Sequence, residues 1–297
     1  MLFLQVGLCF LSVLACEDAT EEHLREVARR VPAWVRVHDG PKDCTLTVVS
    51  SCLDATTGTK WRAIAETWAR AQQTLQEHGS KTPGVWRALY QLGRPLDTNA
   101  FLFETFDSDH EDFFCLMPAK IPRGLWNHAS WIVHTIQVLA MYWHVLKGGT
   151  PLHAAGVARH DRGYLFLGPS GAGKSTVAVL SGRVQGATVH DDWLLVGRRS
   201  GNYFLAHPDS HIAPALRAIL LLRKGDTDRL AALSPQATCA HLARSILDYM
   251  TGQDLSVPWI RQAFHNAAAI ARSIPGYELC FRKSPDFWQV IDVELGP

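Results

Sequence analysis

Apolar residues in the second half of the chain form short runs separated by polar or glycine-containing turns, a pattern typical of strands joined by hairpins. Residues 152–159 and 164–167 predict two strands connected by a tight turn at 160–163. Residues 187–196 and 203–206 predict a second hairpin. Consecutive hairpins place neighbouring strands antiparallel, so we expect a mixed, largely antiparallel sheet in this half.

Further elements of this half follow from helical spacing or from continuous apolar runs: helices at 174–182, 233–247 and 258–270, and strands at 219–222 and 277–281. Ser234 and Pro235 suit the N-cap and the first position of the middle helix. Helices interspersed with such a sheet indicate an α/β fold with α+β character.

The first half of the chain predicts a smaller α+β layer. Its expected elements are strands within 1–16 broken at Gly7, strands at 44–49, 99–106 and 112–117, and helices at 18–31 and 61–76. Carboxylates between 107 and 111 have nearly the spacing of a calcium loop, but the bend glycine and the distal Glu are missing. We therefore predict a solvated hairpin tip there.

Residues 126–146 are apolar enough to raise the question of a membrane span. This stretch also carries His128, His134, Gln137 and His144, which a spanning helix rarely tolerates. Gly148 then follows as a helix terminator. We expect a buried helix lying against a sheet.

Composition narrows the class of protein. The 297 residues are 47% hydrophobic and 19% charged, which is ordinary for a globular protein, and the net charge of +1 argues against a nucleic-acid partner. Seven cysteines without a CxxC pair indicate reduced thiols. The apolar start has no preceding Lys or Arg, which disfavours a signal peptide. We expect a cytoplasmic protein without a membrane partner, and homo-oligomerisation is left open.

The strongest chemical signal is a match to the phosphate-binding motif G-x-x-x-x-G-K-[ST]. Glycines let consecutive backbone N–H groups point at phosphate oxygens, and the following helix directs its positive end at the same anion. The predicted nucleotide-binding residues are Gly168, Pro169, Ser170, Gly171, Ala172, Gly173, Lys174, Ser175 and Thr176. Lys174 would contact the β- and γ-phosphates of ATP, and the Ser175 hydroxyl would ligate Mg²⁺.

The adjacent carboxylates Asp191 and Asp192 are the second chemical feature. Phosphoryl transfer needs a carboxylate for Mg²⁺ and often a second one that accepts the proton of the acceptor hydroxyl. Neighbouring residues of a strand point to opposite faces, so both can serve one site only where the strand ends or bulges. A pair at a strand edge facing water is the alternative.

The order of these motifs resembles the C-terminal catalytic domain of HPr kinase/phosphorylase and its relatives in the PEP-carboxykinase-like P-loop group. In that family a His-Ala or His-Gly strand, a hairpin, a phosphate loop, a short helix and an Asp-Asp strand follow one another. Here the corresponding residues are His153, the loop 168–176 and Asp191-Asp192. The resemblance is good over about residues 150–215 and fainter through 274–288.

The resemblance implies a PEP-carboxykinase-like P-loop fold and an ATP- and Mg²⁺-dependent kinase that phosphorylates a hydroxyl, such as a serine of a peptide or small protein. Lys174, Asp191, Asp192 and His153 would be catalytic, with Ser175 and Asp192 as metal ligands. Which aspartate is the base stays open. The alternative to a catalytic role for His153 is a purely structural one.

The chain also departs from the family pattern. Around Arg217 it lacks the acid and glycines of the family's corresponding segment, which weakens HPr as the substrate. Two alternatives therefore stay open: a nucleotide-binding accessory module without transfer activity, and a kinase for a small metabolite. We expect an N-terminal α+β region at 1–124 and the P-loop catalytic domain at 125–297.

Overall fold

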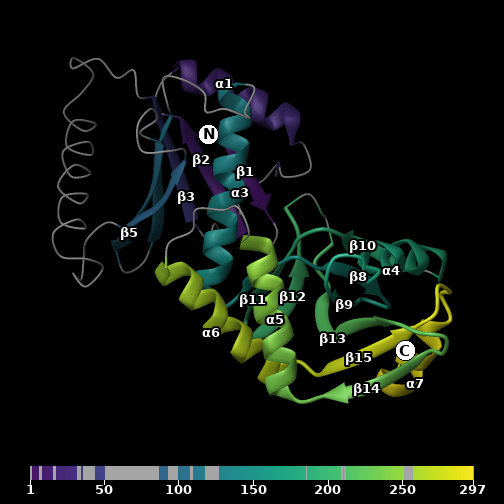
Figure 1. Ribbon diagram of the computed structural model, residues 1–297. Coiled ribbons are helices and arrows are strands. Elements are labelled where there is room, and N and C mark those ends of the chain that lie inside the picture. The colour runs from purple at the N-terminus through teal and green to yellow at the C-terminus, as the bar shows by residue number, and fades with distance from the viewer. Residues whose placement is uncertain are drawn as a thin grey trace. The chain divides into compact units, whose positions relative to one another are not determined.

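The computed structural model describes residues 2–6, 9–15, 18–31, 35, 44–50, 87–92, 100–107, 110–117, 127–184, 186–208, 210, 212–250 and 257–296. The chain divides into two compact units, Met1–Leu139 and Ala140–Pro297 (Figure 1). The helix expected at 61–76 lies outside the described residues. Each unit is considered by itself below.

The first unit contains a six-stranded sheet in the order β1-β2-β3-β6-β5-β4. Its strands are β1 (Leu2–Val6), β2 (Cys9–Ala15), β3 (Cys44–Ser50), β4 (Arg87–Leu92), β5 (Ala100–Asp107) and β6 (His110–Met117). The pairs β1–β2 and β5–β6 are antiparallel, which confirms the predicted strand pair around Gly7 and the hairpin around the acidic turn. Helix α1 (Asp18–Arg30) buries Leu24 and Val27, three residues apart on one helical face.

Helix α3 (His128–Leu146) is the helix predicted at 126–146, and the boundary between the two units falls within it. Its apolar side chains Ile132, Ile136 and Val145 are completely buried. Gly148, with φ +91°, follows its end, as a left-handed residue after a helix commonly does. No helix in the described part of the chain is long and apolar enough to cross a membrane.

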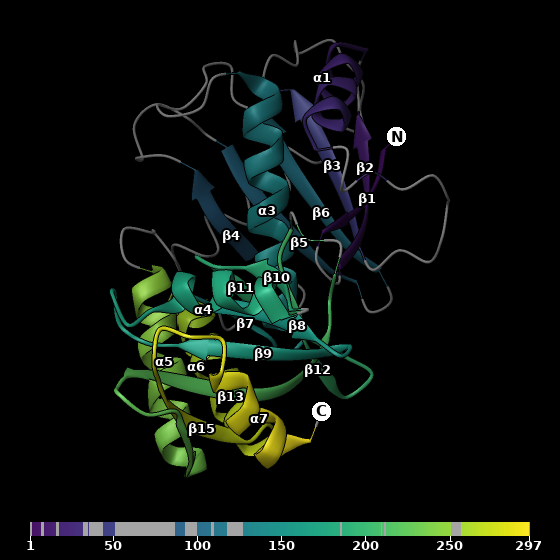
Figure 2. The same ribbon diagram turned by 90° about the vertical axis from the view of Figure 1, so that its right-hand side faces the viewer.

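The second unit is a mixed α/β structure. Seven of its strands form one path, β10-β8-β9-β13-β12-β11-β7, and β15 and β14 continue the sheet from β13. The bounds are β7 (Thr150–Leu152), β8 (Ala155–Arg159), β9 (Arg162–Leu167), β10 (Ala187–His190), β11 (Leu194–Arg199), β12 (Asn202–Ala206), β13 (Ala215–Lys224), β14 (Arg229–Leu233) and β15 (Gly276–Phe281). Among the described strands of this unit, the parallel pairs are β9–β13 and β13–β15, and Figure 2 shows these three strands side by side.

Both predicted hairpins are present. The turn between β8 and β9 holds His160 and Asp161 at φ 50° and 60°, and the turn between β11 and β12 holds Ser200 and Gly201 at φ 49° and 83°. Two central residues with positive φ match the right-handed twist of the flanking strands.

The prediction of single strands at 152–159 and 187–196 was wrong, since each segment is two strands. The first breaks at His153 and Ala154, between β7 and β8, and the second breaks after His190, between β10 and β11. Strands β7 and β8 are consecutive in the chain but lie toward opposite ends of the hydrogen-bonded order. The sheet therefore curls, and both segments must bend where they pass from one end of it to the other.

The helices of this unit are α4 (Lys174–Ser181) with a 3-10 turn at Gly182–Val184, α5 (Pro235–Met250), α6 (Val257–Ser273) and α7 (Phe287–Leu295). Ser234 caps α5 as predicted, because its Oγ accepts a hydrogen bond of 3.2 Å from the Ala237 amide. Strand β14 and helix α7 were not predicted. Aromatic residues of α7 and of β9 pack together in the core, with Tyr164 and Trp288 at 1% and 2% exposure.

Candidate functional site

The loop between β9 and α4 has the backbone that its glycines predict. Gly171 and Gly173 have φ of +77° and +110°, and Gly173 is the N-cap of α4 without a side-chain cap. A Cβ at Gly173 would lie 2.8 Å from the ring tip of Phe281. The first amides of α4 are thus offered to the loop rather than to a capping side chain, which is the geometry of a helix N-terminus that binds an anion.

Lys174 closes this loop. Its Nζ donates hydrogen bonds to the carbonyl oxygens of Gly168 at 2.9 Å and Pro169 at 3.4 Å, and the residue is 7% exposed. Burial lowers the pKa of Lys174, whereas the negative charges of Asp248 and Asp192 raise it. An ammonium has three donors, so two bonds within the loop leave one for a bound phosphate.

Helix α4 is fixed to the core behind the loop. Ser181 Oγ donates to the Val177 carbonyl at 2.7 Å and accepts a hydrogen bond of 3.0 Å from Trp288 Nε1. The Trp288 ring meets Tyr164 edge to face, with centroids 4.9 Å apart. The buried Trp288 thereby joins helix α7 to strand β9 and helix α4. The loop thus connects two elements that are packed in the core.

Asp191 and Asp192 lie in the break between β10 and β11, not on a continuous strand. The strand-face argument against their sharing a site therefore does not apply. The Asp192 carbonyl accepts a hydrogen bond of 3.1 Å from the Ala154 amide, which connects this break to the one at His153. His153 Nε2 is 3.6 Å from Asp192 Oδ1, while Asp191 is exposed. The structure thus brings His153 and Asp192 together.

The carboxylate of Asp192 extends from a turn that His190 organises. His190 Nδ1 accepts hydrogen bonds from the backbone amides of Asp192 and Trp193, at 3.3 and 3.4 Å. The His190 ring stacks on His207, with centroids 3.7 Å apart and planes inclined by 8°. Burial, followed by the charge of His190, lowers the pKa of His207 to about 3. His207 is therefore an uncharged support for the turn at neutral pH.

Helix α5 also contacts the site, and this contact was not predicted. His153 and Ser245 are joined by two hydrogen bonds, from the His153 amide to the Ser245 carbonyl at 3.2 Å and from Ser245 Oγ to the His153 carbonyl at 2.9 Å. One turn further along α5, Asp248 accepts a bond from Arg244 Nε at 3.0 Å and acts on Lys174 through its charge. No motif marks these residues, which lie more than 60 positions beyond the loop.

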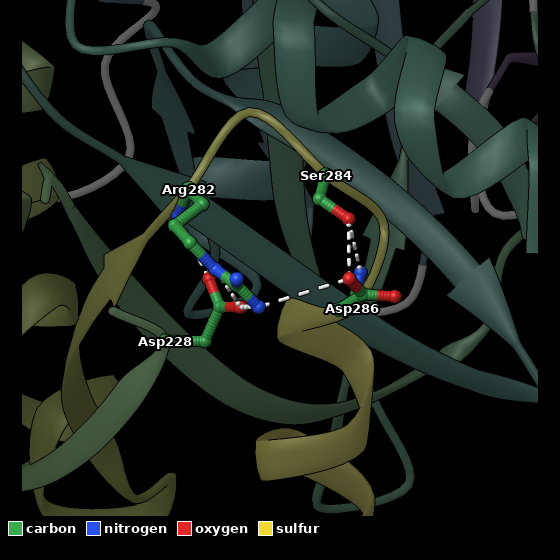
Figure 3. A network of polar contacts seen from close by, with 4 residues as sticks. All are labelled: Asp228, Arg282, Ser284 and Asp286. Atoms are coloured by element: carbon green, nitrogen blue, oxygen red, sulfur yellow. Dashed lines mark hydrogen bonds and ion pairs between the residues drawn. The ribbon is translucent and has the colours of Figure 1, made fainter. Parts of the chain in front are cut away.

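Two arginines of this unit have structural partners instead. Arg217 donates to the Leu295 carbonyl at 2.7 Å, near the end of α7. Arg282 holds Asp228 through its amide, Nε and Nη2 at 2.7 to 3.0 Å, and Asp286 lies 3.7 Å from Nη2 (Figure 3). This network fastens the segment that links β15 to α7. Since Phe281 underlies Gly173, the network also steadies the floor of the phosphate loop.

The family model of SynChlorMet cassette protein ScmC matches residues 126–295, more than half of the chain. The chain belongs to the ScmC family. A search of curated proteins found no match. The region shared with the ScmC family includes every site residue described above, namely the loop, His153, Asp192, Ser245 and Asp248.

In this ScmC-family chain, the described residues contain no group of three or more His, Cys, Asp or Glu side chains placed to hold a metal ion. Ser175 and Asp192 were the predicted metal ligands, and both are exposed. A hydroxyl and one carboxylate fit Mg²⁺ that keeps several waters and takes its other ligands from phosphates. The donor set therefore suits a cation that arrives with a nucleotide.

Proposed function

We propose that this ScmC-family protein is an ATP- and Mg²⁺-dependent kinase that transfers the γ-phosphoryl group to a hydroxyl, of a serine in a peptide or small protein. The observation that carries the proposal is the pairing of Asp192 with His153 beside the glycine-rich loop. The lysine of that loop, Lys174, donates to the Gly168 carbonyl at the first residue of the loop. A loop alone binds nucleotide, whereas a carboxylate positioned beside it also supplies chemistry.

The residues divide the work as follows. The amides of the loop and Lys174 hold the β- and γ-phosphates and neutralise their charge. Ser175 and Asp192 would hold Mg²⁺, which would offset part of the negative charge of the phosphates. The acceptor oxygen attacks the γ-phosphorus, the bond to the β–γ bridging oxygen breaks, and ADP leaves.

The proton of the acceptor hydroxyl goes to a carboxylate of the break, Asp191 or Asp192. His153 lies beside the Asp192 carboxylate and would orient it. The curled, mixed sheet with a hairpin leading into the loop supports a PEP-carboxykinase-like P-loop fold, which we propose for the second unit. We propose the cytoplasm, where ATP is available, as its location.

Transfer from γ-labelled ATP tests this function. The word cassette in the family description directs the first choice of acceptors to peptides and proteins encoded together with this chain. We expect Lys174→Ala and Asp192→Asn to abolish labelling. Asp161→Asn is the matched control, because Asp161 lies at the far end of β9 with φ 60°, a conformation that asparagine adopts readily. Labelling that survives Lys174→Ala would refute the assignment.

A nucleotide-binding accessory role without transfer is the second candidate. It is favoured by Arg217, whose guanidinium donates a hydrogen bond to the Leu295 carbonyl. In a kinase of the family that this chain resembles, we would expect the region around Arg217 to take part in the chemistry. Tight binding of MgATP without labelling of any encoded partner would support this role. Labelling of sugars or nucleosides instead of proteins would support a small-metabolite kinase.

A further inference from the structure

The phosphate loop has acidic residues on one side of it and basic residues on the other, along one edge of the sheet. Strands β9, β13 and β15 are parallel, so their carboxyl ends share this edge. Strand β8 is antiparallel to β9 and β10 is antiparallel to β8, so the start of β8 and the end of β10 lie there as well. In strand order, the edge carries Asp191 and Asp192 after β10, His153 before β8, the loop after β9, and basic residues at the ends of β13 and β15.

This order gives a bound nucleotide its direction. In the proposed function the γ-phosphate lies next to Asp192, which is on the β10 side of the loop. A triphosphate is a linear chain, so its α-phosphate and nucleoside extend away from Asp192. That direction leads over the carboxyl ends of β13 and β15. The basic residues there, which the kinase mechanism does not use, are Arg223, Lys224, Arg282 and Lys283.

The two arginines of this set have carboxylate partners. Arg223 Nε is 2.6 Å from a carboxylate oxygen of Glu278, and Arg282 is bound by the carboxylates drawn in Figure 3. Lys224 and Lys283 are both exposed, and within the described part of the chain neither has an ion pair or a side-chain hydrogen bond. The two lysines therefore remain for a bound anion.

Lys224 extends from the face of the sheet that carries the phosphate loop. It is two residues beyond Leu222 on β13 and is the register partner of Phe281 on β15, so these three side chains point to one face. Leu222 Cβ lies 3.6 Å from where a Cβ at Gly168 would be. The ring tip of Phe281 lies 2.8 Å from where a Cβ at Gly173 would be. Both neighbours of Lys224 on this face thus contact the loop, and Lys224 is the exposed residue next to them.

The other charged groups at this edge are less well placed. Lys283 follows the end of β15, outside any strand register, and the preceding Arg282 turns toward Asp228. Asp226 lies in the turn after β13, and among the described residues it forms no ion pair with Lys224. The strand register therefore selects Lys224 as the cation beside the loop.

We propose that Lys224 is a nucleotide-binding residue that contacts the α-phosphate, and that the nucleoside lies over the carboxyl ends of β13 and β15. The inference rests on the proposed function, which places the γ-phosphate beside Asp192. It divides the edge of the sheet between the acceptor, on the side of β8 and β10, and the nucleoside, on the side of β13 and β15. A lysine ammonium binds phosphate as a point charge on a flexible stem, which suits an exposed position.

Competition against mant-ATP in the presence of Mg²⁺ tests this assignment with three unlabelled ligands, ATP, ADP and pyrophosphate. Pyrophosphate matches the β- and γ-phosphates and has no counterpart of the α-phosphate. Lys224→Gln should therefore weaken ATP and ADP by a similar factor of at least about five, since a charge-assisted hydrogen bond is lost. The affinity for pyrophosphate should change by less than about twofold, because solvent and salt screen an exposed charge that makes no direct contact.

Three variants separate a direct contact from a general loss of positive charge. Lys224→Arg retains the charge and should restore most of the affinity for ATP. Arg183→Gln removes an exposed positive charge at the end of α4 away from the loop, and it should change none of the three affinities. Lys283→Gln should weaken ATP less than Lys224→Gln does. Equal urea midpoints would show that the fold is intact in each variant.

Several results would overturn the proposal. An unchanged affinity for ATP in Lys224→Gln would make Lys224 a solvated surface lysine. An equal loss for pyrophosphate, or an equal loss in Arg183→Gln or Lys283→Gln, would indicate a general electrostatic field. A loss for ATP without one for ADP would place Lys224 at the γ-phosphate.

Failure of the kinase function is recognised separately, because competition against mant-ATP requires no phosphoryl transfer. A protein that loses ATP and ADP but not pyrophosphate in Lys224→Gln, yet labels no acceptor, would retain this inference and lose the kinase assignment. A protein that labels an acceptor but binds nucleotide equally well in Lys224→Gln would retain the kinase assignment and lose this inference. A wild type that binds no mant-ATP would overturn both.

Discussion

Substitution of Gly173 by alanine tests whether the phosphate loop depends on backbone shape as the structure indicates. Gly173 has φ +110° and ψ 20°, where an L residue is strained, at a cost on the order of 1–3 kcal/mol. Its new Cβ would also lie 2.8 Å from Phe281 Cζ, and Phe281 is 4% exposed and packed edge to face on Phe287. Overpacking of such a ring costs about 1–3 kcal/mol more.

Two other glycines provide matched controls. Gly171 has φ +77° but open space around its Cβ position, so Gly171→Ala should cost only the strain, about 1–2 kcal/mol. Gly182 has φ −61° and open space, so Gly182→Ala should be neutral or stabilise by about 0.4–1 kcal/mol. The expected order of loss in stability is therefore Gly173, then Gly171, then Gly182.

Urea unfolding can be monitored by hydrogen exchange of peptides from β9 and β13. This probe measures the stability of the second unit without interference from the first. The cause is isolated in a Phe281→Leu background, which removes Cζ. There Gly173→Ala should lose only the strain contribution, and the two substitutions should couple favourably. Equal midpoints for Gly173→Ala and Gly182→Ala, or no coupling with Phe281→Leu, would refute this account of the loop.

Three further predictions concern buried or supporting residues of the second unit. Trp288→Ala removes a buried indole, and urea unfolding should show a loss of about 3–5 kcal/mol in the second unit, far above that of a surface change. Burial lowers the pKa of His144 to about 4, so between about pH 6.5 and 4 the unfolded state binds a proton that the folded state does not. The free energy of unfolding should therefore decrease by up to about 3 kcal/mol as the pH is lowered through that window, and His144→Leu should flatten this dependence in unfolding measured at pH 7 and 5. His190→Ala should weaken phosphoryl transfer by loosening Asp192, whereas His190→Asn should retain most of it, because an asparagine oxygen can accept the same backbone amides; equal kcat/KM for both variants would contradict that role.

The local parts of the site were predictable from sequence because short segments carry the required information. Positive φ at Gly171 and Gly173, the two hairpin turns and the Ser234 cap each depend on residues within a few positions of one another. The helix after the glycine-rich loop therefore begins at Lys174 as predicted, and it ends at Ser181, one residue before the expected end. The same local reasoning failed at His153 and at Asp191-Asp192, because an apolar alternating pattern continues across a break in a strand.

The tertiary structure decided which of the candidate residues meet. The sheet curls because β7 and β8 adjoin in the chain yet belong to opposite ends of the strand order. The curl brings the break after β7 and the break after β10 together, and the Ala154 amide there donates to the Asp192 carbonyl. Helix α5 then brings Ser245 to His153 across 92 positions of sequence. Contacts at such separation leave no periodicity or spacing to detect, since they depend on how whole elements pack. The sequence by itself determined the glycine-rich loop and its lysine between β9 and α4, and only the packing of α5 and of the broken strands determined that Ser245 and Asp192 both meet His153.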